Sequence, residues 1–145
     1  MNGGDVLLDH EKLDVYQLAR ELTRVCPTLL EQVPPGRTDL VDQCRRTTIS
    51  IPLNIAEGAG KFAPKEKARF YRIAKRSATE TAAVLDHMVD LNLPHPSEVN
   101  KAKALLRRII GALVKLILST ERVPVTRTTT SAPAPARKRV RASDP

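Results

Sequence analysis

The spacing of the aliphatic side chains constrains the fold of this chain more than any other feature. Leu, Ile, Val and Ala recur at steps of three and four residues, and no segment alternates apolar and polar residues as a half-buried strand would. Aromatic residues make up only 3% of the 145 residues and Trp is absent, so the core must be aliphatic. The pattern predicts an all-α protein, and the chain length fits one domain.

Four stretches carry this helical pattern, and short segments join them. We expect helices from Glu11 to Cys26, from Thr38 or Asp39 to the glycines near residue 58, from Pro64 to Leu91, and from Ser97 to about Thr120. Pro27 is expected to end the first helix or to start a short separate turn, because proline lacks the backbone N–H that a helix interior needs. Four amphipathic helices with short connections favour an up-down-up-down four-helix bundle over residues 11–122.

One proline lies inside the second stretch, in the segment SIPLNIAEGAGK (residues 50–61). Proline in a helix interior loses a hydrogen bond and costs about 3 kcal/mol. The apolar residues around it nevertheless keep one helical phase. They are Leu40, Cys44, Ile51, Ile55 and Phe62. We therefore predict a continuous helix kinked at Pro52, with Ser50 bonding backbone left unpaired near the bend, and with Gly58 and Gly60 at the helix end.

The two ends of the chain lack the apolar pattern. Residues 1–10 are expected to be a flexible N-terminus, without the basic and apolar run of a signal peptide. Residues 123–145 are basic and rich in Pro, Ala and Thr, so we expect a disordered tail that buries no core. The longest apolar run, Ile109 to Leu118, contains Lys115 and is too short to span a membrane. These features predict a cytoplasmic protein with no membrane partner.

Side chains suited to catalysis or metal binding are scattered. His10, His87 and His95 form no catalytic or metal-ligand pattern, and no phosphate loop or dinucleotide fingerprint is present. Cys26 and Cys44 lack metal-type or redox-type spacing, and we expect them to be small buried thiols in a reducing compartment. We therefore expect no enzymatic activity, no metal and no cofactor.

The positive charge is unevenly distributed. The formal net charge is +8 at pH 7, with ten basic and five acidic side chains over residues 37–80, and five basic and one acidic over residues 123–145. A basic excess concentrated in this way suggests a polyanionic partner.

Most of the basic side chains on the expected helices fall into stripes. One stripe lies on the third helix away from its apolar face, scarcely interrupted by acidic residues; another recurs every seven residues on the fourth helix; a basic pair lies on the second. In that order they are Lys65, Arg69, Arg72 and Arg76, then Lys101, Arg108, Lys115 and Arg122, then Arg45 and Arg46. Arginine suits phosphate because it donates two parallel hydrogen bonds. Few aromatic side chains are available for base stacking, so we predict binding to nucleic acid, RNA or DNA, with little sequence specificity. An ordinary solvated helix surface is the alternative.

Residues 39–81 resemble the signature of a known family. The pattern is Gln-x-Arg-Arg, then Ser-Ile-x-x-Asn-Ile-Ala-Glu-Gly, then Phe-x-x-Ile-Ala-x-x-Ser-x-x-Glu. It is matched here by Gln43, Arg45, Arg46, Ser50, Ile51, Asn54, Ile55, Ala56, Glu57, Gly58, Phe70, Ile73, Ala74, Ser77 and Glu80. This signature is similar to that of the small proteins encoded in intervening sequences of bacterial large-subunit ribosomal RNA genes.

The resemblance implies a four-helix bundle that assembles into a five-fold ring, a homopentamer, with no known enzymatic activity. The accessory variability protein of diversity-generating retroelements shares the fold and binds nucleic acid and a reverse transcriptase. The chain departs from the pattern at Lys75-Arg76, where Arg-Gly is commoner, and its basic tail lies outside the pattern. Two hypotheses follow, a nucleic-acid-binding oligomer or an adaptor that docks a protein such as a reverse transcriptase.

The signature also places polar residues on the second helix, opposite its apolar face. These are Arg46, Ser50, Asn54, Glu57 and Lys61. Glu57 and Glu80 are expected to pair with Lys61 and Arg76, each four residues away. We expect a structural or subunit-interface role for the motif, because short polar side chains near a kink usually satisfy backbone groups. Its members are Ser50, Pro52, Asn54, Glu57, Gly58, Ser77 and Glu80.

Overall fold

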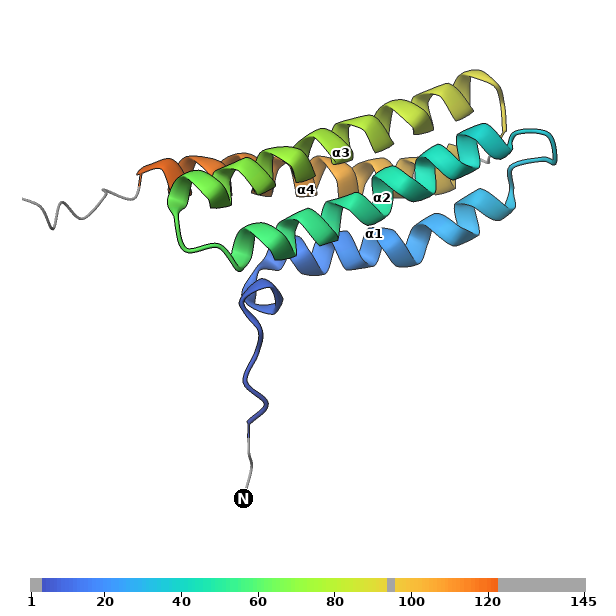
Figure 1. The fold of residues 1–145 in the computed structure, drawn as a ribbon. Coiled ribbons are helices and arrows are strands. Elements are labelled where there is room, and N and C mark those ends of the chain that lie inside the picture. The colour runs from blue at the N-terminus through green and yellow to red at the C-terminus, as the bar shows by residue number, and fades with distance from the viewer. Residues whose placement is uncertain (1–3, 94–95, 123–145) are drawn as a thin grey trace, which may run out of the picture.

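Four long α-helices follow a short 3-10 helix in the computed structural model, which describes residues 4–93 and 96–122 (Figure 1). The elements are η1 (Asp9–Lys12), α1 (Asp14–Glu31), α2 (Thr38–Ala59), α3 (Pro64–Asp90) and α4 (Pro96–Arg122), and the described residues include no strand. Each long helix packs against the next along the chain, and α1 packs against α4. The connections α1–α2 and α3–α4 lie at one end of the bundle and α2–α3 at the other. The all-α prediction is confirmed, whereas the predicted tail lies outside the described residues.

The core is aliphatic, as the composition predicts. The largest fully buried side chains come from all four helices and are mostly Leu and Ile. They include Leu22, Leu29, Ile51, Ile55, Leu85, Leu106, Ile109 and Leu113. Cys26 and Cys44 are free thiols buried in the same cluster.

The first helix does not end at Pro27, contrary to expectation. α1 runs through the proline to Glu31 and buries Leu29 and Leu30 in the last turn. Burying a leucine side chain stabilises a fold by roughly 1.5–3 kcal/mol, so two of them offset the roughly 3 kcal/mol that an interior proline costs.

The second helix is continuous through Pro52, as predicted. The bend at that residue stays a prediction. α2 begins at Thr38, but Arg37 occupies the N-cap position and makes no side-chain cap. The prediction that Phe62 faces the core is wrong, because α2 ends at Ala59 and the Phe62 side chain is fully exposed beyond it.

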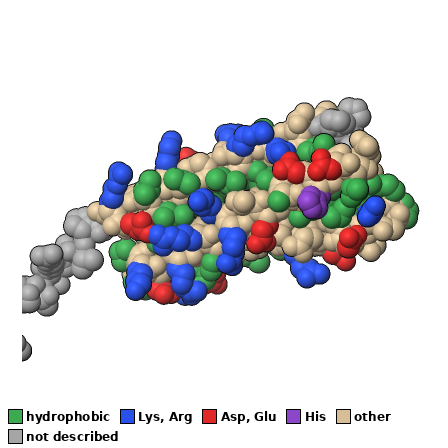
Figure 2. All heavy atoms as spheres, turned by 90° about the horizontal axis from the view of Figure 1, so that it is seen from above, with side chains coloured by type: hydrophobic (Ala, Val, Ile, Leu, Met, Phe, Trp, Pro, Cys, Tyr) green, Lys and Arg blue, Asp and Glu red, His purple; other side chains and the backbone are tan. Residues whose placement is uncertain are grey.

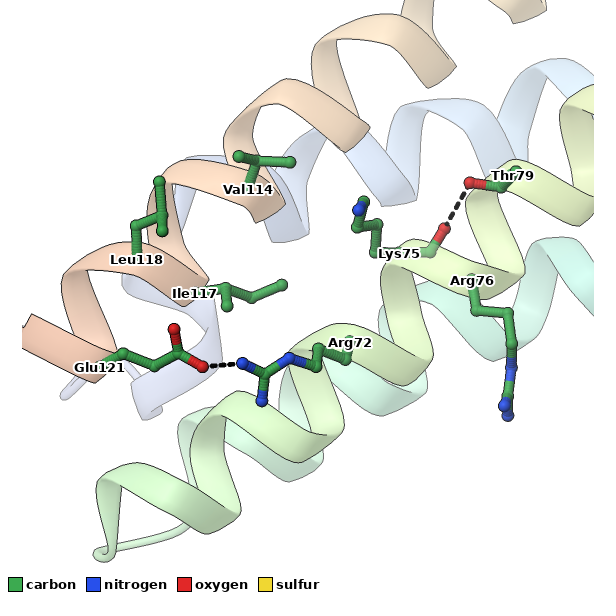
Figure 3. Close-up of a pocket in the computed structure, with 8 residues that line it drawn as sticks. All are labelled: Arg72, Lys75, Arg76, Thr79, Val114, Ile117, Leu118 and Glu121. Atoms are coloured by element: carbon green, nitrogen blue, oxygen red, sulfur yellow. Dashed lines mark hydrogen bonds and ion pairs between the residues drawn. The ribbon is translucent and has the colours of Figure 1, made fainter.

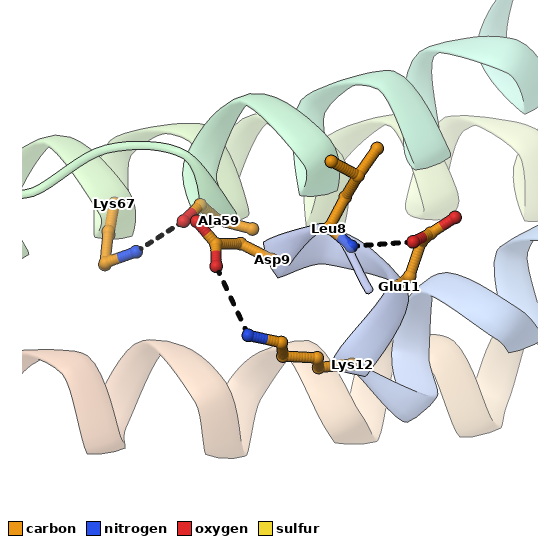
Figure 4. A network of polar contacts seen from close by, with 6 residues as sticks. All are labelled: Leu8, Asp9, Glu11, Lys12, Ala59 and Lys67. Atoms are coloured by element: carbon orange, nitrogen blue, oxygen red, sulfur yellow. Dashed lines mark hydrogen bonds and ion pairs between the residues drawn. The ribbon is translucent and has the colours of Figure 1, made fainter. Parts of the chain in front are cut away.

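The segment before α1 contacts the bundle through η1. η1 contains Asp9 and His10, the last two residues of the expected flexible N-terminus, and it packs against α1 and α2. The Leu8 N–H donates to Glu11 Oε2 at 2.7 Å, and Asp9 pairs with Lys12 at 3.7 Å (Figure 4).

Gly58 lies at a close contact between α2 and α3. A Cβ atom built on Gly58 would lie 2.6 Å from Cε1 of Tyr71 and 3.2 Å from the carbonyl oxygen of Lys67. The Tyr71 ring is buried over this glycine, and burial, with the charge of Asp9 second, raises the pKa of its hydroxyl. Tyr71 is thus a buried side chain of α3, whereas the signature residues Phe70 and Ile73 are only half-buried.

The end of α2 is also held by α3. Lys67 Nζ donates to the carbonyl oxygen of Ala59 at 2.8 Å and to that of Gly58 at 3.3 Å (Figure 4). These carbonyls belong to the last turn of a helix, where intrahelical donors run out. One lysine therefore caps α2 directly beside the glycine contact.

Replacing Gly58 by Ala should lower the free energy of unfolding by about 1–3 kcal/mol, because the added methyl group overpacks the Tyr71 ring. The matched control is Gly111→Ala, on an exposed position of α4 with no atom within 4 Å of the new Cβ. That change should raise the free energy of unfolding by about 0.5–1 kcal/mol through helix propensity alone. Urea unfolding followed by circular dichroism measures both, and equal effects of the two substitutions would contradict the close contact.

Candidate nucleic-acid interface

The outer surface of α3 carries a row of basic side chains. Lys65, Arg69, Arg72 and Arg76 are all exposed, and with Glu66 and Ile73 they line a hollow of about 480 Å³. We call these four basic residues the α3 face. The predicted stripe therefore forms one continuous surface on a rigid helix.

Two members of the α3 face have carboxylate partners. Arg69 pairs with Glu66 one turn away at 3.7 Å, and Arg72 pairs with Glu121 of α4. The sequence could not reveal the second pair, because it joins residues of different helices. Within the described part of the chain, Lys65 and Arg76 form no ion pair, and the predicted Glu80–Arg76 pair is absent. Glu57 pairs with Lys61 at 3.8 Å, as predicted.

The Phe70 ring contacts basic side chains at the α3 face. The Arg69 guanidinium carbon lies 4.5 Å from the centre of the Phe70 ring, and Lys61 Nζ lies 5.3 Å from it. Cation–π contacts of this kind hold a charged group against an aromatic ring while leaving its donors free. The signature match includes Phe70 but did not predict this contact.

A groove with an apolar floor lies between α3 and α4. Its volume is about 530 Å³, and its walls come equally from the two helices. They are Arg72, Lys75, Arg76 and Thr79 of α3, and Val114, Ile117, Leu118 and Glu121 of α4. Figure 3 shows Arg72 directed toward Glu121 and Arg76 directed away from α4. We call this feature the α3–α4 groove.

The basic residues of α4 divide into two groups. Lys115 and Arg122 lie beside Leu118 and border the α3–α4 groove. Lys101 and Arg108 are exposed further back along α4, and Arg45 and Arg46 are exposed on α2. Figure 2 shows Lys and Arg side chains gathered toward the end where α3 begins and α4 ends, with apolar side chains among them. The structure thus brings together only part of the predicted set.

The polar motif residues join α2 to α3. Ser50 Oγ and Ser77 Oγ share a hydrogen bond of 2.8 Å between the helices, and Asn54 Nδ2 donates to the Ser50 hydroxyl and carbonyl oxygens at 3.0 and 2.8 Å. Ser50 therefore bonds the neighbouring helix and not the unpaired backbone that the sequence predicted. Glu57 and Glu80 of the motif remain exposed.

Two buried threonines form a second polar contact between α2 and α3, which the sequence did not predict. Thr81 Oγ1 donates to Thr47 Oγ1 at 2.9 Å, and both side chains are buried. The Ser77 carbonyl oxygen lies 2.8 Å from Thr81 Oγ1 and is an alternative acceptor for the same hydroxyl proton. These contacts thus support a structural role for Ser50 and Ser77, whereas a subunit-interface role for the motif stays a prediction.

The thiols of Cys26 and Cys44 both lie near the hydroxyl group of Thr48. Thr48 Oγ1 is 3.6 Å from Cys26 Sγ and 3.9 Å from Cys44 Sγ. Hydrogen bonding from Cys44 lowers the pKa of Cys26, and hydrogen bonding from Cys26 with burial raises the pKa of Cys44. The burial expected from sequence is confirmed, and the polar contact adds to it.

The described residues contain no group of three or more His, Cys, Asp or Glu side chains placed to hold a metal ion. None of the helices in this part of the chain is long and apolar enough to cross a membrane.

A family model with the description 23S rRNA-intervening sequence protein matches residues 11–115. The match covers α1, α2 and α3 entirely and α4 as far as Lys115. No curated protein matches the chain.

A double-mutant cycle tests the structural role of the motif serines. Ser50→Ala and Ser77→Ala should each cost about 1 kcal/mol in the free energy of unfolding, with a coupling energy of about 0.5–1.5 kcal/mol between them. Thr79→Ala is the control partner for Ser50→Ala, because Thr79 Oγ1 donates only within its own helix, to the Lys75 carbonyl oxygen at 3.0 Å. Chemical denaturation gives all the values, and zero coupling between the serines would contradict the proposed bond.

Proposed function

The chain belongs to the 23S rRNA-intervening sequence protein family, and on this premise we propose that it is a cytoplasmic, oligomeric protein that binds nucleic acid and catalyses no reaction. In this proposal the α3 face contacts phosphates and reads little base sequence. The cytoplasmic location is supported by two free thiols, which reducing compartments maintain.

The proposal rests on the basic side chains of the α3 face that have no carboxylate partner or only a weakly bound one. Lys65 and Arg76 are exposed and have no carboxylate partner in the described part of the chain. Arg69 is paired with Glu66 only through an exposed contact of 3.7 Å, and such pairs are worth little, so phosphate can displace the carboxylate. From Lys65 to Arg76 the helix rises about 16 Å at roughly 1.5 Å per residue. This length matches about five phosphates at roughly 3.4 Å along one strand.

The arrangement of the aromatic residues favours contacts with the nucleic-acid backbone over recognition of its bases. Tyr71 is buried, Tyr16 packs edge-on against His10 with ring centres 4.7 Å apart, and two cations flank Phe70. Phe62 alone is fully exposed. Proteins that bind single strands usually present several aromatic platforms for successive bases, so this set supports binding without sequence readout.

Oligomerisation would strengthen such a surface. The resemblance to the family implies a ring, with five copies as the expected number. A ring repeats the α3 face in every copy, and linked weak sites gain affinity by avidity without new contacts. We therefore propose that modest phosphate contacts in one copy add up around the assembly.

Replacing Lys65, Arg69 and Arg76 by Gln should weaken binding to a structured RNA and to duplex DNA of any sequence alike. The plot of log affinity against log salt should become shallower by about one unit per lost phosphate contact, and so by about three units per copy. Arg72 is left in place because it pairs with Glu121. Mobility shifts across a salt series measure both quantities after light scattering confirms an intact assembly.

The matched control replaces three exposed basic residues away from the α3 face, Arg45, Lys101 and Arg108, by Gln. Both variants lose the same charge and keep the basic stretch 123–145, so a difference between them reports position and not net charge. Equal losses in the two variants would contradict a dedicated α3 face. Unchanged affinity and slope in the first variant would favour the adaptor hypothesis, in which the bundle docks a protein such as a reverse transcriptase.

A further inference from the structure

An apolar arm extends from the N-terminal end of the bundle. Residues 4–8, which we call the arm, precede η1, and Figure 1 shows the chain there directed away from the helices. Val6, Leu7 and Leu8 are 90%, 53% and 60% exposed. Scattered apolar side chains on a surface are ordinary, but three in succession on a projecting segment mark a contact surface.

The α3–α4 groove offers the complementary surface. Val114 and Leu118 form part of its floor and are 37% and 44% exposed although they lie on a helix of the bundle. Apolar side chains in a concave groove give an extended segment both area to bury and walls to fix it. The groove therefore has room and chemistry for a short apolar strand.

The charges of the two surfaces are also complementary. Asp5 is the one charged side chain of the arm, whereas Arg72, Lys75 and Arg76 line the groove with Glu121 as its one acidic residue. Lys115 and Arg122 add further positive charge at its border. The basic stretch 123–145 would meet like charge here. An acidic apolar segment is thus favoured over the C-terminal end of the chain.

The position of the arm determines whether it can reach the α3–α4 groove of its own copy or that of another copy. In Figure 1 the arm leaves the bundle from η1, which packs against α1 and α2, and runs away from all four long helices. The arm therefore points away from the groove of its own copy. A contact between an arm and the groove of another copy joins two different surfaces, and such head-to-tail contacts generate a closed ring or a filament.

We propose that the arm of each copy docks in the α3–α4 groove of a second copy, with Val6, Leu7 and Leu8 against Val114 and Leu118. The inference rests on the oligomeric part of the proposed function and names the contact that would build the assembly. Asp5 then lies among the cations of the groove. Lys65 and Arg69 of the α3 face do not line the groove and stay open to nucleic acid.

Two variants of the full chain test the contact from both sides. The arm variant carries Val6→Ser, Leu7→Ser and Leu8→Ser, and the groove variant carries Val114→Asp and Leu118→Asp. All five positions are exposed, so both variants should keep the helical content of the parent. Light scattering should give an oligomer for the parent and the 16.0 kDa monomer for each variant. The control variant, Ile49→Ser with Leu53→Ser, changes exposed apolar residues of α2 and should stay oligomeric.

Mixing the two variants makes the test directional. The arm variant keeps an intact groove and the groove variant keeps an intact arm, so one contact can form between them and none can extend it. The mixture should therefore give a one-to-one dimer of twice 16.0 kDa. An arm variant that stays oligomeric, or a mixture that stays monomeric, would overturn the inference while leaving nucleic-acid binding untouched. A monomeric parent would overturn the oligomeric part of the proposed function as well.

Discussion

The contact of Tyr71 with Gly58 is the constraint on which the arrangement of α2 and α3 depends. The ring leaves no space for a Cβ at residue 58, so the backbone of α2 there packs directly against the Tyr71 side chain of α3. Further along, the Ser50–Ser77 and Thr47–Thr81 hydrogen bonds fix the same pair of helices in register. Buried polar pairs of this kind favour one alignment, because any slip would leave hydroxyl groups unpaired.

This alignment determines which side of α3 faces solvent. With Tyr71 and Ser77 turned inward, Lys65, Arg69 and Arg76 must lie on the outer surface of the same helix. The basic surface is therefore a consequence of the packing and is held by a rigid element, as binding surfaces that track a regular backbone require. The α3–α4 groove arises beside it, where Arg72 and Glu121 join the helices at the rim.

Periodicity predicted the helices well because apolar spacing reports directly on burial. It also predicted correctly that α2 continues through Pro52. The prediction failed at Pro27, because the burial of Leu29 and Leu30 outweighs the tendency of proline to end a helix. It also failed at Phe62, which has the helical spacing of the apolar face but lies beyond the end of α2. The α3 face could be read from one helix alone. The Arg72–Glu121 pair and the groove could not, because they depend on how two distant segments pack.

The central claim is that nucleic acid lies on the α3 face, and lysine footprinting tests it most directly. The protein is acetylated with and without a structured RNA at low salt, and the modification of each lysine is measured by mass spectrometry. Lys65 and Lys101 are both exposed and lie on different helices, so each serves as a reference for the other. The account predicts that RNA protects Lys65 several-fold more than Lys101. Equal protection of the two, or protection of Lys101 alone, would contradict it.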